Sequence, residues 1–105
     1  LIRGVGPTLG GFGVPGTLAD PQLKLIDQAG TVIATNDDWS TPVAAAAAST
    51  AQISAAASAV GAFAYTPASK DAALLVNLAP GPYTVQLSGS GTTTGAALVE
   101  VYELP

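Results

Sequence analysis

The sequence predicts a mainly β protein: an antiparallel β-sandwich with one inserted alanine-rich helix. Short apolar runs alternate with clusters of Gly, Pro, Asn and Asp along most of the chain, and such runs are typical of strands separated by turns. The pattern changes only between residues 43 and 60, where alanine dominates. A chain of 105 residues has the size of a single domain, so we expect one domain over residues 1–105.

The first half of the chain predicts a strand, a loop and a hairpin. Residues 1–5 form an apolar run that stops at Gly6-Pro7, and the Gly- and Pro-rich residues 6–19 predict a loop. Residues 22–26 and 31–36 flank the segment Asp27-Gln28-Ala29-Gly30. An Asp at the start and a Gly at the end suit a turn whose last residue is left-handed. We therefore expect a hairpin here.

The alanine-rich segment predicts a helix over about residues 42–60. Thr41 can cap it, with Pro42 in the first position, where the missing N–H of proline costs nothing. Alanine is the strongest helix former, and Gly61 offers a left-handed stop. The alternative, a silk-like polyalanine strand, does not account for these start and stop signals. At helical spacing, one face of the helix carries Val43, Ala47, Thr50, Ile53, Ser54, Ala57 and Val60.

The second half of the chain predicts three more strands. Residues 72–78 form a nearly continuous apolar run, and a Pro-Gly-Pro turn follows at residues 80–82. Residues 83–87 alternate between apolar and polar, which is typical of a half-buried strand. A polar loop over residues 89–95 leads to the last strand, residues 96–103.

Composition favours association with like chains over binding to nucleic acid or membrane. The net charge is −4, and the three basic residues are far apart, so they form no patch for phosphates. No stretch is apolar enough to span a bilayer. Only 10% of residues are charged, against roughly 25% in an ordinary globular protein. The low charge predicts that neighbouring copies cover much of the surface; glycans or polar uncharged side chains are the alternatives, although the sequence contains no Asn-x-Ser/Thr sequon.

The residue types argue against catalysis. The chain has neither His nor Cys, so the most common general base and the best nucleophile are missing. Residues 11–16 match the dinucleotide-binding pattern Gly-x-Gly-x-x-Gly, but no strand runs into them and no helix follows. We therefore predict no enzyme activity, no catalytic residues and no organic cofactor.

Five residues with oxygen-bearing side chains suggest an alternative role in calcium binding. They lie in predicted turns and strand ends, and Asp37 and Asp38 are expected near the point where Asp20 enters the paired strand. Hard oxygen ligands in loops suit Ca²⁺, whereas ordinary turn chemistry explains the same residues without a metal. We favour turn chemistry and keep the calcium site as the alternative. Its candidate ligands are Asp20, Asp27, Asn36, Asp37 and Asp38.

The large aromatic residues are interpreted as core. Trp39, next to the predicted helix start, is expected to seal the sandwich edge; the alternative is an exposed platform on which a sugar stacks. Phe12 and Phe63 are predicted to lie in the core.

Blocks of sequence along nearly the whole chain resemble a repeat-like domain of large secreted bacterial proteins. Their core spacing, Asp-x-x-Leu-x-Leu, Asp-x-x-Gly, Asn-Asp-Asp and later Pro-Gly-x-Tyr, is similar to that of bacterial pre-peptidase C-terminal (PPC) domains. The blocks are LIRGVGP (1–7), FGV (12–14), LADP (18–21), IATNDDW (33–39), KDAALL (70–75), PGPYT (80–84) and ALVEVY (97–102).

This resemblance implies a jelly-roll-like sandwich that serves as a non-catalytic unit of exported proteins, outside the cell or on its surface. Members of the family carry further strands ahead of residues 1–7. We therefore expect that the domain lacks N-terminal strands here or that another copy supplies one. The expected function is a structural module that self-associates in an extracellular filament, sheath or surface protein by strand complementation. The alternative is an accessory domain that binds calcium or polysaccharide.

Overall fold

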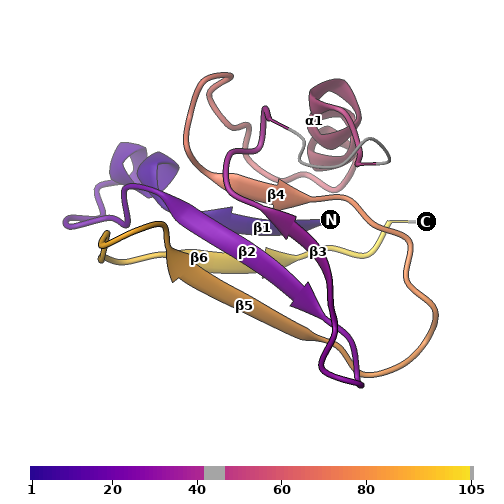
Figure 1. Cartoon of the computed structure of the whole chain (residues 1–105). Helices are drawn as coiled ribbons and strands as arrows, with labels where there is room; N and C mark the ends of the chain where they lie inside the picture. Colours follow the sequence, from indigo (N-terminus) through magenta and orange to yellow (C-terminus); the bar gives the residue numbers. More distant parts are fainter. Residues whose placement is uncertain (42–46, 105) are drawn as a thin grey trace.

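The computed structural model describes residues 1–41 and 47–104 and contains two three-stranded antiparallel sheets (Figure 1). One sheet has the strand order β4-β1-β6 and the other β3-β2-β5. The elements in chain order are β1 (Ile2–Val5), the 3-10 helix η1 (Pro7–Phe12), β2 (Pro21–Ile26), β3 (Val32–Asn36), α1 (Thr50–Ala59), β4 (Ala72–Leu74), β5 (Thr84–Gly89) and β6 (Leu98–Val101). The prediction of a mainly β fold is confirmed.

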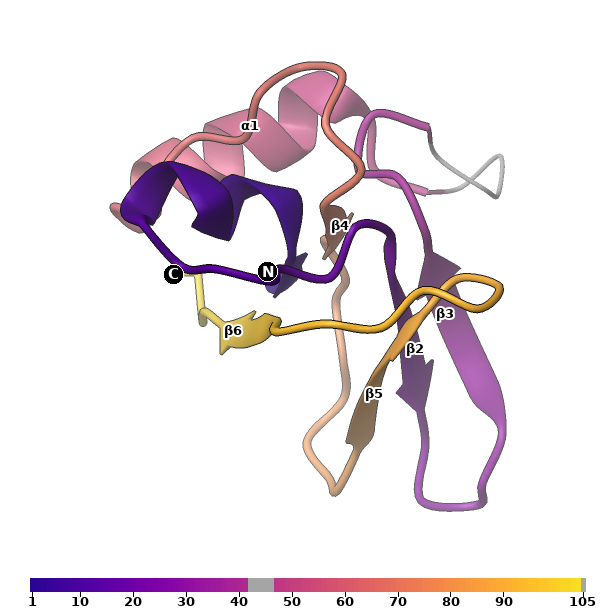
Figure 2. The ribbon, with the colours of Figure 1, turned by 90° about the vertical axis from the view of Figure 1, so that its left-hand side faces the viewer.

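The two sheets face one another across an apolar layer, an arrangement consistent with a β-sandwich. Ile2 and Leu74 of the first sheet pack with Leu23 and Leu25 of the second, and all four are buried. Between the sheets, β2 contacts both β1 and β4, and β3 contacts β4. β5 and β6 therefore lie at corresponding edges, and Figure 2 shows that these two strands diverge.

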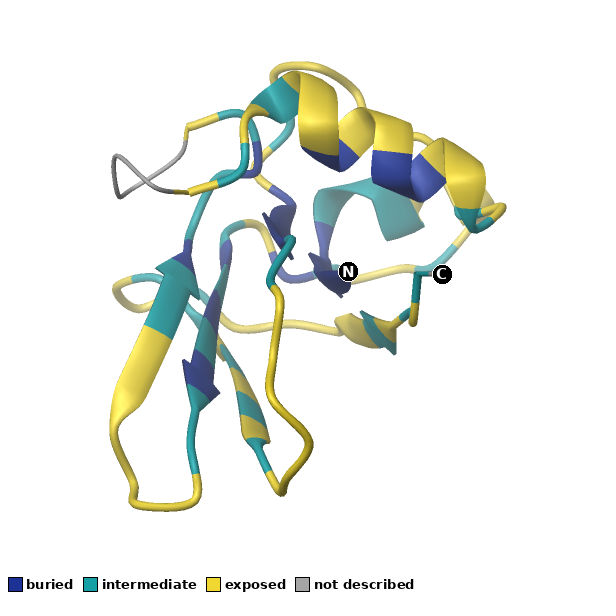
Figure 3. Ribbon diagram, turned by 90° about the vertical axis from the view of Figure 1, so that its right-hand side faces the viewer, coloured by how far each residue is buried: buried dark blue, intermediate teal, exposed yellow. Residues whose placement is uncertain are grey.

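A second apolar cluster lies on the other side of the first sheet, beneath α1. Ile53, Ala56 and Ala57 of the helix are buried there with Leu1 and Trp39. Figure 3 shows the buried side of α1 turned toward the sheet. The prediction that Trp39 is a core residue is confirmed, because only 5% of its surface is exposed and its Nε1 donates a hydrogen bond to the carbonyl of Thr66.

The helix begins later than the sequence predicted. Its N-cap is Ser49, whose side chain accepts a hydrogen bond from the backbone N–H of Gln52 while the Gln52 side chain accepts from the Ser49 N–H. This reciprocal capping box fixes the start at Thr50, and residues 47–49 are not helical. Of the predicted start, residues 42–46 lie outside the described residues. The predicted stop is confirmed, since α1 ends at Ala59 and Gly61 is left-handed (φ 74°).

The predicted hairpin is confirmed. β2 and β3 are joined by a turn in which the N–H of Gly30 donates to the carbonyl of Asp27, with Gly30 at φ 85°. A bulge shifts the register between Leu25 and Ile26. Among the described residues, no helix has the length and apolar character needed to cross a membrane.

Two other expectations need correction. The fourth strand, predicted over residues 72–78, forms ladder pairs only at Ala72–Leu74, because the chain then leaves the edge of the sheet. The placement of Phe12 in the core is wrong, since 62% of its surface is exposed at the end of η1. The Phe12 ring packs on that of half-buried Phe63, with 4.9 Å between ring centroids.

Candidate functional site

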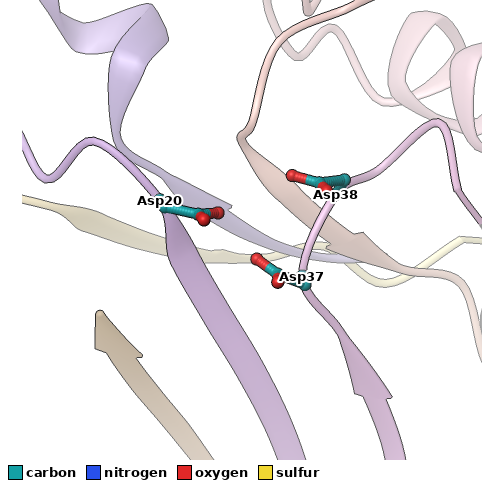
Figure 4. A group of neighbouring side chains, drawn as sticks. All are labelled: Asp20, Asp37 and Asp38. Atoms are coloured by element: carbon teal, nitrogen blue, oxygen red, sulfur yellow. The ribbon is translucent and has the colours of Figure 1, made fainter. Parts of the chain in front are cut away.

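Three of the five predicted ligand residues meet at one end of the β2–β3 pair. Asp20 directly precedes β2, while Asp37 and Asp38 directly follow β3. Because the two strands are antiparallel, the start of one adjoins the end of the other. Each of the three carboxylates offers an oxygen, and these oxygens lie within 4.8 Å of one another (Figure 4).

The acidic cluster carries unbalanced negative charge. Within the described part of the chain, Oδ1 of Asp20 and Oδ1 of Asp38 are buried without a hydrogen-bond partner. Asp37 Oδ1 accepts a hydrogen bond from the Ser90 hydroxyl at 3.0 Å. Burial raises the pKa of Asp20 to about 6; a hydrogen bond to Asp37 that favours the protonated form and repulsion from the Asp37 and Asp38 carboxylates add to the shift.

This shift makes the contribution of Asp20 to stability depend on pH. The folded protein holds the Asp20 proton more tightly than the unfolded chain, in which the pKa is near 3.8. Asp20 therefore favours folding most strongly below pH 3.8, and this contribution is lost as the pH rises through about 6. Above that pH, the folded protein keeps three close carboxylates together.

The other two predicted ligands are engaged elsewhere. Asp27 starts the turn at the opposite end of β2, where its Oδ1 accepts from the N–H of Thr31 at 2.9 Å. Asn36 is buried, and its side-chain amide links the two sheets. Its Oδ1 accepts from the N–H of Ala73 at 3.0 Å, and its Nδ2 donates to the carbonyl of Asp38 at 3.1 Å. Asn36 thus fixes the backbone beside the cluster.

The donor set fits a hard cation in part. Ca²⁺ takes six to eight oxygen ligands, and the cluster supplies three carboxylates, two of which have a buried oxygen with no hydrogen-bond partner among the described residues. A cation here would relieve the repulsion that raises the pKa of Asp20. Solvent would have to supply most of the remaining ligands, so the arrangement suits a weak site.

Sequence reasoning missed a buried cation in the first sheet. Arg3 is 1% exposed, and its guanidinium carbon lies 4.4 Å from the Phe63 ring centroid and 4.0 Å from that of Tyr65. Arg3 Nε forms an ion pair with Glu100 Oε1 at 3.2 Å, and Nη1 donates to the carbonyl of Phe63 at 2.6 Å. The available signal was the single charged residue within the apolar run of residues 1–5. A charge in a buried strand requires partners, so this position indicates a buried ion pair.

A buried anion, Asp71, was also missed. Its Oδ1 accepts from the backbone N–H groups of Gly6 at 2.8 Å and Thr8 at 3.2 Å. Its Oδ2 accepts from the hydroxyls of Thr8 and Ser69. These contacts are typical of a structural carboxylate that joins three segments.

A groove opens between the two sheets on the side of β3 and β4. It has a volume of about 530 Å³ and is lined by β3, by residues 73–77 and, from the helix, by Ile53. Its walls are mainly small and aliphatic side chains. It contains none of the three clustered carboxylates, so the groove and the acidic cluster are separate features.

Comparisons of the chain with protein-family models, with curated proteins and with solved structures gave no match.

Proposed function

We propose that this chain is a non-catalytic structural module that associates with copies of itself, as part of an extracellular bacterial filament, sheath or surface protein. Its fold class in this proposal is a jelly-roll-like sandwich of the PPC type. The proposal rests on the resemblance of the sequence blocks and on the surface of the sheets.

The observation that carries the proposal is the exposure of apolar side chains on edge strands. Val32 and Ile33 on β3 are 48% and 45% exposed, and Val99 and Val101 on β6 are 42% and 69% exposed. Single exposed apolar residues are common, but two on the same edge strand mark a surface that another chain can cover. Since only 10% of the chain is charged, little opposes such contacts.

Edge strands also provide the backbone groups to which a strand from another copy can hydrogen-bond. A strand paired on one side presents free N–H and C=O groups, to which an added strand can bind. The described residues form two open three-stranded sheets, so each of these sheets ends in two edge strands.

Electron microscopy of the purified chain at high concentration tests the proposal. Regular filaments or sheets are the expected result. Dispersed particles at every concentration would contradict it, and a mildly acidic sample provides a control for charge repulsion between chains of net charge −4.

A second candidate function is calcium binding by the acidic cluster. The convergence of Asp20, Asp37 and Asp38 favours it, whereas the buried position of Trp39 removes the residue on which polysaccharide stacking would rest. Calorimetric titration with Ca²⁺ after chelation should give a weak heat signal that Asp37→Asn reduces and Asp27→Asn leaves unchanged. A flat trace for the unmodified chain would eliminate this candidate.

A further inference from the structure

We propose that β6 is the self-association edge and that it pairs, antiparallel and about a two-fold axis, with β6 of a second copy. This inference rests on the proposed function and specifies one of its contacts. A two-fold contact joins copies only in pairs, so a filament needs a second contact in addition. The side chains of β6, its backbone and the state of the other three edges support the β6 contact.

The side chains of Val99 and Val101 belong to the inner face of the sandwich but have no cover. Val101 is paired with Ile2 and Val99 with Gly4, and directly paired residues share a face. That face is the inner one, because a Cβ on Gly4 would come within 2.8 Å of Leu87 in the second sheet. Ile2 is 4% exposed, whereas Val101 is 69% exposed. The sheets diverge at this edge (Figure 2), which leaves the two valines uncovered.

The backbone of the same two residues is directed away from β1. Leu1 and Tyr102 exchange both hydrogen bonds, N to O, at 2.8 Å. In an antiparallel ladder, hydrogen-bonded pairs alternate with non-bonded pairs. The backbone N–H and C=O groups of Glu100 therefore point toward β1, whereas those of Val99 and Val101 point away from it. The N–H and C=O groups of Val99 and Val101 therefore form an edge of the sheet that no other described strand pairs with.

Two of the other three edges carry features that oppose pairing. On β4, the N–H of Ala73 is bound by Asn36, and the adjoining carbonyl of Asp71 accepts from the Trp39 N–H at 2.9 Å. β3 is distorted by its bulge, and bulges protect edges. β5 exposes polar side chains at alternate positions, so its surface is less apolar than that of β6. Among the described residues, none blocks the edge of β6, and apolar residues lie on both of its faces.

The one charge on β6 is neutralised within its own subunit. Glu100 is paired with Arg3 and accepts a hydrogen bond from the Tyr102 hydroxyl at 2.7 Å. A second β6 can therefore approach without meeting a free like charge. Two-fold pairing places the same face of both strands on one side of the joined sheet, so the valines of the two copies lie side by side and pack against one another. This self-complementarity identifies a second copy as the occupant.

Sedimentation equilibrium of the full chain and two variants tests the inference. Val101→Lys places a charge on the free edge, and the matched control Val32→Lys does the same on β3, where the residue is also exposed. We expect a dimer whose dissociation constant rises about tenfold or more in Val101→Lys, a change of about 1.4 kcal/mol, and stays unchanged in Val32→Lys. Urea unfolding at low concentration, followed by Trp39 fluorescence, verifies that both variants fold.

The outcomes separate the two proposals. A chain that associates but responds only to Val32→Lys would overturn the β6 contact and leave the proposed function standing. Species larger than a dimer that Val101→Lys dissociates directly into monomers would overturn the two-fold arrangement, because a two-fold contact joins copies only in pairs. A chain that is monomeric at all concentrations would overturn both the contact and the proposed function.

Discussion

Replacing Asp71 with alanine removes one carboxylate that accepts hydrogen bonds from four donors. The side chain is fully buried, and its donors are the N–H groups of Gly6 and Thr8 and the hydroxyls of Thr8 and Ser69. It joins the end of β1 to η1 and to the segment before β4. The replacement leaves these donors facing a small cavity.

The structure sets the size of the loss. The two hydroxyls are partly buried and can rotate toward water, but the two backbone N–H groups are fixed by the chain. Each buried donor left unpaired costs about 1–3 kcal/mol, so the two together cost about 2–6 kcal/mol. Release of a buried charge offsets part of this cost, and we expect a decrease of about 3 kcal/mol in the free energy of unfolding. The free energy of unfolding of a small domain is only about 5–15 kcal/mol in total.

Urea unfolding followed by the fluorescence of Trp39 measures the effect. This residue is a local reporter, because its N–H donates to the carbonyl of Asp71 at 2.9 Å. Asp27→Ala is the matched control, since Asp27 lies in an exposed turn and accepts one hydrogen bond there. A decrease for Asp71→Ala no larger than that of the control would refute the assignment of Asp71 as a structural junction.

Three further predictions concern the contact between the two sheets, the start of the helix and the acidic cluster. Gly4→Ala brings its Cβ against the end of the Leu87 side chain and within 3.1 Å of Cγ of the fully buried Leu23, which has no room to move, and should lower stability by about 1–3 kcal/mol in urea unfolding; an unchanged midpoint would mean that the sheets pack less closely. Ser49→Ala removes the N-cap of α1 and should cost about 1 kcal/mol by thermal unfolding, whereas no loss would contradict the capping box. Asp20→Asn should stabilise the protein at pH 7 and flatten the pH dependence of its stability between pH 4 and 6, and a variant with the same pH profile as the parent would exclude the raised pKa.

Local patterns were sufficient to predict most of the strands. The alternation of apolar and polar residues in β5 and the turn sequence after β2 each involve only a few neighbouring residues. The structure contains both the strand and the turn, as predicted. The helix start was wrong because two capping signals compete. Thr41-Pro42 was the more conspicuous, but Ser49 and Gln52 form the reciprocal hydrogen bonds. Phe12 was misplaced because hydrophobicity alone does not reveal that a 3-10 helix holds the residue at the surface.

The acidic cluster could be predicted in part, since the ends of paired strands adjoin. This reasoning places Asp20 beside Asp37 and Asp38. Asp27 follows the other end of β2, so it lies one strand length away from the cluster. The roles of Arg3 and Asp71 could not be predicted, because their partners are far away in sequence. Arg3 and Glu100, which form an ion pair, lie near opposite ends of the sequence. They meet because β1 pairs with β6 in the first sheet.

Sedimentation velocity of the unmodified chain over a wide dilution series tests self-association most directly. Uncovered valines on a free sheet edge predict a sedimentation coefficient that rises with protein concentration. A single monomeric species at every concentration, with the same protection of the Val99 and Val101 amides from hydrogen exchange throughout, would contradict the account.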